Sequence, residues 1–275
     1  MSEHTLGIDL GGTKMLLYGE GVHERIETGS AFTPNDLSHH LTKFVASHRL
    51  SPTRIGIAVP GLVDADGAVL ASDVLPLFSG WQPRLDLAAM KVKWSVLNDV
   101  MAALLEEMHD APPGLTGGVV MVGTAIGPGL WVDGKPLLGA SGWAGELGYL
   151  PLMIDDRVDR LDQLAGGRAI AAHCSVSPGL LAEQAKSGDL ATLQAIGSGG
   201  RALGLGLAAL INLLNPSRLA LGGGTVELPG YWEQALRSAE AHSIPVLWRD
   251  CQISKVREGA FVVAKGALRS ARQAD

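Results

Sequence analysis

The stretch that decides the fold is Gly7-Ile8-Asp9-Leu10-Gly11-Gly12-Thr13-Lys14, near the start of a chain of 275 residues. Its apolar residues predict a strand that ends at a glycine pair, and residues 15–18 are expected to form the hairpin partner. Glycines let a backbone approach phosphates closely, and a neighbouring carboxylate can hold Mg²⁺ through water. Taken alone, the stretch fits an ordinary hairpin turn equally well.

Outward from this stretch, short apolar runs alternate with amphipathic ones, which is typical of an α/β protein. Pro112-Pro113-Gly114 interrupts the pattern, and after it strand, glycine loop and strand recur at residues 118–132. This weak internal repeat predicts two similar half-molecules. We expect a smaller N-terminal domain at 1–112, a larger domain at 113–258 and a terminal helix within 259–275.

Apolar runs predict strands at residues 6–10, 54–59, 94–97, 118–122 and 219–221. Apolar residues at helical spacing predict helices at residues 36–48, 100–108, 178–187, 189–214 and 260–272. A hairpin is expected around Asp66-Gly67. The most apolar run, 202–214, is shorter than the roughly 20 residues of a membrane span. We interpret it as a buried core helix.

Composition excludes several classes of protein. The formal net charge of −6 argues against a nucleic-acid-binding surface, which needs a basic stripe. The two cysteines, Cys174 and Cys251, predict neither a disulfide framework nor a cysteine-ligated metal. The N-terminal Met1-Ser2-Glu3-His4 has no basic segment followed by an apolar one, so no signal peptide is predicted. We expect a cytoplasmic protein that does not associate with membranes.

A second glycine-rich segment, Gly123-Thr124-Ala125-Ile126-Gly127-Pro128-Gly129, occupies the matching point of the second half. Phosphoryl transfer depends mainly on positioning and charge stabilisation. Two glycine loops, one in each domain, would hold a triphosphate from both sides. The second loop therefore favours phosphate binding over a simple turn.

Two further motifs carry polar side chains suited to a sugar. Asn98-Asp99 follows an apolar strand, where Asp99 could accept a hydroxyl proton and Asn98 could bind substrate. Both residue types are also common helix N-caps. Gly142-Trp143-Ala144-Gly145-Glu146-Leu147-Gly148-Tyr149 offers a carboxylate and a phenol on a glycine-rich backbone, and it also fits a surface loop.

Together these motifs resemble those of the bacterial ROK-type sugar kinases, which include glucokinases, fructokinases and N-acetylmannosamine kinases. The resemblance covers nearly the whole chain. Its segments are, in chain order, residues 7–14, Ile57-Ala58-Val59-Pro60-Gly61-Leu62-Val63-Asp64, Gly80-Trp81, Asn98-Asp99, residues 123–129, Gly145-Glu146-x-Gly148 and residues 222–224.

The resemblance implies the actin-like ATPase (ribonuclease H-like) fold, with two similar α/β domains flanking a cleft and a terminal helix that returns to the first domain. It implies ATP, Mg²⁺ held through water by Asp9, and a sugar hydroxyl that gives its proton to Asp99. The residues implied near the nucleotide are Asp9, Gly11, Gly12, Thr13, Lys14, Gly123, Thr124, Gly127, Gly222, Gly223 and Gly224. Those implied near the sugar are Asn98, Glu146 and Gly61. A homodimer is a further implication.

The chain departs from the family pattern in its sugar pocket. Tyr149 stands where the family has a histidine that contacts the sugar and often zinc, and residues 151–159 lack the family's cysteine cluster. We therefore expect no structural zinc. Asp162 stands where the family has a sugar-binding Glu, and Asp73 is the nearest polar counterpart of a family Asn.

An ATP-dependent sugar kinase is therefore the predicted function. The altered pocket leaves open a catalytically altered or inactive, kinase-like sugar-binding protein. A transcriptional sugar sensor is disfavoured because the first strand begins almost at the N-terminus and the chain is acidic. A kinase for a non-sugar acceptor is a third possibility.

Overall fold

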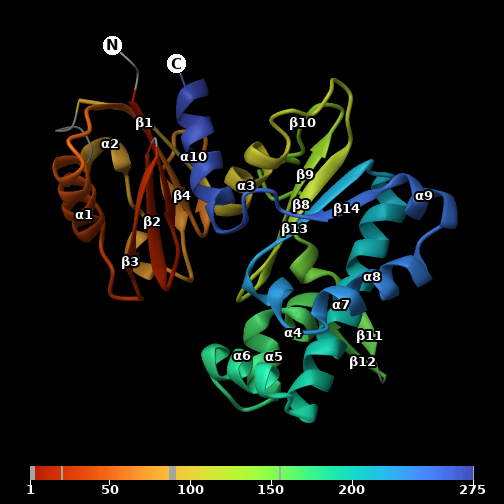
Figure 1. Cartoon of the computed structure of the whole chain (residues 1–275). Helices are drawn as coiled ribbons and strands as arrows, with labels where there is room; N and C mark the ends of the chain where they lie inside the picture. The colour runs from red at the N-terminus through yellow and green to blue at the C-terminus, as the bar shows by residue number, and fades with distance from the viewer. Residues whose placement is uncertain (1–3, 20, 87–90, 155, 275) are drawn as a thin grey trace. The chain divides into compact units, whose positions relative to one another are not determined.

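The computed structural model describes residues 4–19, 21–86, 91–154 and 156–274. The chain divides into two compact units, and each is described by itself (Figure 1). Unit 1 comprises Met1–His109 and Ala260–Asp275, and unit 2 comprises Asp110–Gly259.

Unit 1 is built on a five-stranded sheet in the order β3-β2-β1-β4-β7. Its strands are β1 (His4–Leu10), β2 (Lys14–Gly19), β3 (Val22–Glu27), β4 (Pro52–Val59) and β7 (Lys93–Asn98). The first three pair antiparallel, whereas β4 and β7 continue the sheet in parallel with β1. The predicted strand, glycine turn and hairpin partner are thus confirmed.

Helices and a small hairpin complete unit 1, and they are α1 (Pro34–Ser47), α2 (Pro83–Asp86), α3 (Asp99–Glu107), α10 (Val262–Gln273) and the pair β5 (Leu62–Val63) and β6 (Val69–Ala71). Helix α1 is capped by Thr33, whose hydroxyl oxygen accepts from the Asp36 N–H in a reciprocal capping box. Its buried Leu37, Leu41 and Phe44 have the predicted helical spacing.

The C-terminal helix α10 packs directly on the sheet of unit 1, beside β1 (Figure 1). This close approach needs glycine. A Cβ on Gly7 would collide with the carbonyl oxygen of Ala264, and a Cβ on Gly56 would collide with that of Ala267. The helix predicted at the end of the chain is therefore an integral part of the first unit.

Unit 2 repeats the same sheet order with β10-β9-β8-β13-β14. The strands are β8 (Gly117–Val122), β9 (Ile126–Val132), β10 (Lys135–Pro136), β13 (Arg218–Gly222) and β14 (Gln252–Lys255). Three antiparallel strands are again followed by two parallel ones. The duplicated topology confirms the predicted repeat and the actin-like α/β fold.

The remaining elements of unit 2 are β11 (Pro151–Ile154), β12 (Arg157–Arg160), α4 (Leu161–Ala165), α5 (Gly167–His173), α6 (Pro178–Ser187), α7 (Leu190–Leu214), α8 (Tyr231–His242) and α9 (Pro245–Asp250). Among the described residues α7 is the one helix long and apolar enough to cross a membrane, but 67% of its most apolar window is buried inside the protein. The prediction of a buried core helix at 202–214 is confirmed.

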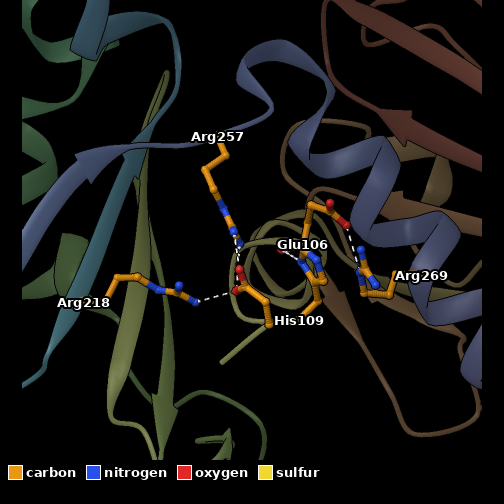
Figure 2. Close-up of polar contacts among 6 residues, drawn as sticks. Glu106, His109, Arg218, Arg257 and Arg269 are labelled. Carbon is orange, nitrogen blue, oxygen red and sulfur yellow. Dashed lines mark hydrogen bonds and ion pairs between the residues drawn. The ribbon is translucent and has the colours of Figure 1, made fainter. Parts of the chain in front are cut away.

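Ion pairs lie where the chain leaves one unit for the other (Figure 2). In unit 2 the carboxylate of Asp110 accepts from Arg257 at 2.6 Å and from Arg218 at 3.2 Å. These contacts, with the Arg257 hydrogen bond the largest, hold the pKa of Asp110 below its usual range. In unit 1 the Arg269 Nε donates to Glu106 Oε2 at 2.9 Å and so ties α10 to α3.

Candidate active site

Three parallel strands of unit 1 end at one edge of the sheet. Asp9 of β1 is level with Ala58 of β4, and Val59 of β4 is level with Asn98 of β7. Asp9, the Pro60-Gly61 turn and Asn98-Asp99 therefore lie at the same carboxyl edge, where ligands bind in open α/β sheets.

The two aspartates at this edge have raised pKa values. Burial is the main cause for both, and it raises the pKa of Asp99 to about 6, against a weaker lowering by the Val100 N–H. The pKa of Asp9 rises to about 7 because of burial and the nearby negative charge of Asp99, although Lys14 lowers it. Perturbed carboxyl groups of this kind are typical of functional sites.

Asn98 is the N-cap of α3, and both ends of its amide are used. Its Oδ1 accepts from the Val100 and Met101 N–H groups at 2.9 and 3.3 Å, while Nδ2 donates to the Gly61 carbonyl at 2.9 Å. Since an amide nitrogen has two hydrogens, one donor has no acceptor among the described residues and remains for a ligand. Asn98 thus joins the start of α3 to the turn after β4.

Gly61 must be glycine in this turn. Its φ is +134°, and a Cβ would collide with the carbonyl oxygen of Ala71. The turn is held further by Ser72, whose hydroxyl donates to the Pro60 carbonyl at 2.6 Å. Sequence reasoning missed Ser72, because its partner lies twelve residues earlier and no local motif marks it.

The turn that contains Gly11, Gly12, Thr13 and Lys14 is closed by the Gly11 N–H, which donates to the Lys14 carbonyl at 3.0 Å. Thr28 holds the turn from outside, because its hydroxyl donates to the Gly11 carbonyl at 2.7 Å. In the described part of the chain, the N–H groups of Gly12 and Thr13 have no protein acceptor. They are available to an anion.

Asp73 is exposed and lies between the two turns. Its neighbour Ser72 lies close to Gly61. Its other neighbour, Val74, lies so close to Gly12 that a Cβ on Gly12 would collide with the Val74 side chain. The segment therefore brings Asp73 to the same edge of the sheet as the other predicted residues of unit 1.

Replacing Asp9 with Asn is expected to raise the melting temperature Tm of the metal-free protein. The rise should be about 2–4 °C for each kcal/mol gained in the free energy of unfolding. The pKa of Asp9 is raised in the folded protein, so ionising this carboxyl group costs stability. The wild type has its full stability below the unfolded-state pKa of about 3.9 and loses part of it as the pH rises through about 7. The gain should therefore be larger at about pH 8 than at about pH 4.5. Thermal unfolding in EDTA measures it, and an equal Tm change at both pH values would contradict this origin.

In unit 2, Glu146 and Asp162 form a second carboxylate pair. The Ile126 N–H donates to Asp162 Oδ1 at 2.7 Å, and a Cβ on Gly148 would collide with the Asp162 carboxylate. Burial raises the pKa of both groups, and the charge of Asp162 raises that of Glu146 further. Asp162 is thus fixed by backbone contacts beside the segment that carries Glu146.

Tyr149 is 60% exposed, and the guanidinium of Arg160 lies 4.5 Å from the centre of its ring. A cation over an aromatic face contributes about 0.5–1 kcal/mol at an exposed site. The family's cysteine cluster is missing from residues 151–159, and in this part of the chain β11 (Pro151–Ile154) pairs antiparallel with β12 (Arg157–Arg160). That this segment binds no zinc stays a prediction.

The second glycine loop is shorter than expected. Only Gly123, Thr124 and Ala125 lie outside the strands, and Gly127 belongs to β9, level with Met121. The expected loop at 123–129 was wrong because Ile126 and Leu130 are buried in the core, which draws the intervening residues into the strand ladder.

A cavity of about 270 Å³ adjoins this loop in unit 2. Its lining combines Gly123, Thr124 and Gly224 with Pro178 and Leu181 of α6. A Cβ on Gly224 would meet no atom within 4 Å, so the backbone there faces open space. The cavity is large enough for part of a small molecule, and it has both apolar walls and backbone amides.

Glycines 222 and 223 shape the strand end before this cavity. Gly223 has φ +96°, and a Cβ there would collide with the Val122 carbonyl. A Cβ on Gly222 would press on Met121 and Val256. Thr225 then closes the loop, because its hydroxyl donates to the Gly123 carbonyl at 2.9 Å.

Mg²⁺ fits the carboxyl edge of unit 1. This ion is usually bound by one or two carboxylates together with substrate phosphates, rather than by a cage of protein ligands. Asp9 and Asp99 supply two carboxyl groups whose mutual repulsion a cation would relieve. Groups of three or more His, Cys, Asp or Glu able to hold a metal are not found among the described residues.

Comparisons with known proteins find similarity over nearly the whole chain. The model of the ROK family matches residues 5–273. The N-acetyl-D-glucosamine kinase of Vibrio vulnificus (strain YJ016) is 34% identical over 165 residues, which cover 54% of this chain and 53% of that protein. That of Aliivibrio fischeri is 29% identical over 300 residues, covering 95% and 97%.

Among solved structures, the ROK hexokinase from Thermus thermophilus is similar, with a TM-score of 0.78, 26% identity and 98% of each chain covered. The chain spans about half the length of the first curated relatives that it matches.

Proposed function

Because the chain belongs to the ROK family, we propose that it is an ATP-dependent sugar kinase acting on a hexose or hexose derivative. The observation that carries this proposal is the position of Asp99. Its carboxyl group lies at the ligand edge of the unit 1 sheet, and burial raises its pKa to about 6. A carboxylate with such a pKa is suited to general-base work near neutral pH.

In the proposed reaction Asp99 accepts the proton of a sugar hydroxyl. The sugar oxygen forms a bond to the terminal phosphorus of ATP, and the bond from that phosphorus to the bridging oxygen breaks. ADP leaves with the bonding electron pair. Asn98 and Gly61 position the start of α3, so that the carboxylate of Asp99 is held in place.

The acceptor would be held through hydroxyl groups by Glu146 and Asp162 of unit 2, with Tyr149 beside them. From unit 1, Asp73 and the free Asn98 N–H would add polar contacts. Rigid carboxylates suit this task because each can accept hydrogen bonds from two neighbouring hydroxyls.

The donor nucleotide would use the backbone-rich surfaces. In unit 1 the N–H groups of Gly12 and Thr13 would bind phosphate oxygens, with Lys14 adding positive charge. In unit 2 the cavity beside Gly123, Thr124 and Gly224 would take the nucleoside. Asp9 would hold Mg²⁺ through water, and this ion would neutralise charge on the phosphates.

A protein that uses ATP and a free sugar is expected in the cytoplasm. The homodimer implied by the resemblance stays a prediction.

Catalysis by Asp99 predicts an acid limb in the pH profile. The value of kcat/KM for the sugar should fall below about pH 6, by about tenfold per pH unit, because only the ionised carboxylate accepts a proton. Measurement from about pH 4.5 to 8 at saturating MgATP, with Tm recorded at each pH, would show it. A profile that stays flat down to about pH 5 would rule out a base of this pKa.

The proposed function is tested by coupled ADP release with MgATP across a panel of hexoses, N-acetylhexosamines, and anhydro- and amino-sugars. We expect a sugar-dependent rate for a small set of these acceptors. ADP release that no sugar changes, in a protein that binds ATP by calorimetry, would contradict the proposal and favour an altered or inactive kinase-like protein.

A further inference from the structure

Arg168 lies in the first turn of α5, and its backbone is tied to the glycine loop of unit 2. Its N–H donates to the Thr124 carbonyl at 3.2 Å, and the N–H of Gly167 donates to the Gly123 carbonyl at 2.9 Å. A Cβ on Gly167 would collide with that same carbonyl, so α5 begins in direct contact with the loop. The backbone of Arg168 is therefore fixed beside the proposed nucleotide cavity.

The side chain of Arg168 is exposed and lines that cavity. Helix α6 forms an apolar wall with Pro178, Leu181 and Ala182, whereas Arg168 belongs with Thr124 to the polar part of the lining. A nucleotide has an aromatic end and an anionic end. An apolar wall suits the aromatic base, and a guanidinium suits phosphate oxygens.

Arg168 also acts on the acceptor site. Its positive charge lowers the pKa of Asp162, as does that of Arg160, against a larger increase caused by burial. The guanidinium is thus within electrostatic reach both of the nucleotide cavity and of a carboxylate proposed to hold the sugar. A phosphoryl group that passes from nucleotide to sugar has to cross between these two places.

The guanidinium donors of Arg168 are not used by the described residues. In the described part of the chain, its guanidinium has no hydrogen-bond acceptor. Five N–H donors in a planar fork, left open to solvent beside a cavity, match the geometry of a phosphoryl group.

We propose that Arg168 is a catalytic residue whose guanidinium donates hydrogen bonds to the phosphoryl group during transfer. This inference rests on the proposed kinase function. The bonds formed and broken are those of the reaction above, and the proton still passes to Asp99. Arg168 stays protonated throughout and stabilises the charge that spreads over the non-bridging oxygens.

The test compares Arg168→Ala and Arg168→Lys with Arg157→Ala, which removes an exposed arginine of the same unit whose carboxylate contact, to Asp159, is 3.6 Å long. We expect Arg168→Ala to lower kcat by about 100-fold or more, as loss of a charge-stabilising donor does. The KM for the sugar should change little, Arg168→Lys should retain part of the rate, and added guanidinium should restore part of it to Arg168→Ala. Arg157→Ala should match the wild type.

Two kinetic results would overturn the inference. One is a kcat for Arg168→Ala within about threefold of the wild type. The other is a change confined to the KM of the sugar without rescue by guanidinium, which would mean that Arg168 acts only through Asp162.

A wild type without turnover would refute the proposed function alone. A binding experiment would then still test whether Arg168 contacts the phosphates of the nucleotide. ATP and AMP are titrated into the wild type and into Arg168→Ala, and calorimetry gives the affinity of each protein for each nucleotide. Weaker binding of ATP but not of AMP by Arg168→Ala would support contact with the terminal phosphates. Where no sugar gives turnover, equal affinities for ATP in the wild type and Arg168→Ala would overturn the inference; where the wild type turns over, the kinetics decide.

Discussion

Replacing Asp99 with Asn is expected to lower kcat for sugar phosphorylation by about 10²–10⁴-fold, the usual contribution of a general base. Asn has nearly the same shape but cannot accept the hydroxyl proton. The cap of α3 should survive, because Asn98 is the N-cap residue and Asn at position 99 can still accept from the Val100 N–H. Affinity for ATP should therefore change little, and steady-state kinetics with calorimetry of ATP binding measure the two effects separately.

The matched control is Asp66→Asn, a substitution in the exposed turn of the β5–β6 hairpin. Asn-Gly suits such a turn as well as Asp-Gly does, so this variant should keep wild-type kinetics. An Asp99→Asn protein with near-normal turnover would refute the role of Asp99 as the base.

The largest expected effect on folding is that of Gly56→Ala. A Cβ at this buried position in β4 would collide with the backbone carbonyl of Ala267 in α10, which cannot rotate away as a side chain does. We expect a loss of about 3 kcal/mol, at the upper end for overpacking. At about 2–4 °C for each kcal/mol, that corresponds to a fall in Tm of about 6–12 °C.

Gly29→Ala is the control for this substitution, since a Cβ at Gly29 would meet no atom within 4 Å. Differential scanning calorimetry of both variants gives the comparison. Equal Tm values for Gly56→Ala and Gly29→Ala would mean that α10 does not pack on β4 as closely as the structure shows.

The sequence predicted the duplicated fold because its buried strands are apolar and end in glycines. It missed two edge strands. β14 reads Gln252-Ile253-Ser254-Lys255, which has a single apolar residue, and it forms a strand through parallel pairing with β13. β3 reads Val-His-Glu-Arg-Ile-Glu and is largely polar, because its alternate side chains are exposed. Neighbouring strands, rather than local propensity, decide such edges.

The candidate site was predictable where one short motif contains both the carboxylate and the glycine, as in Asp9 with Gly11. It was not predictable where distant segments meet. Thr28 holds the Gly11 turn, and Arg168 lines the cavity beside Gly224, yet neither lies in a motif. Between the adjacent Asn98 and Asp99, only the structure shows which side chain caps the helix.

The structure shows how two of the altered residues of the predicted sugar pocket, Tyr149 and Asp162, are held. Tyr149 is stacked under Arg160, and Asp162 is fixed by the Ile126 N–H. Asp has one methylene less than the Glu of the family pattern, and a shift of about 1 Å in a binding group is enough to change rate or specificity. These positions are where the choice of acceptor is expected to be made.

The central claim is phosphoryl transfer from ATP to a sugar, and product analysis tests it most directly. The protein is incubated with MgATP labelled in its terminal phosphate and with each acceptor of the panel, and the sugar fraction is examined for label. The account predicts a labelled sugar phosphate with the wild type and almost none with Asp99→Asn. Label found only in inorganic phosphate, whichever sugar is present, would contradict it.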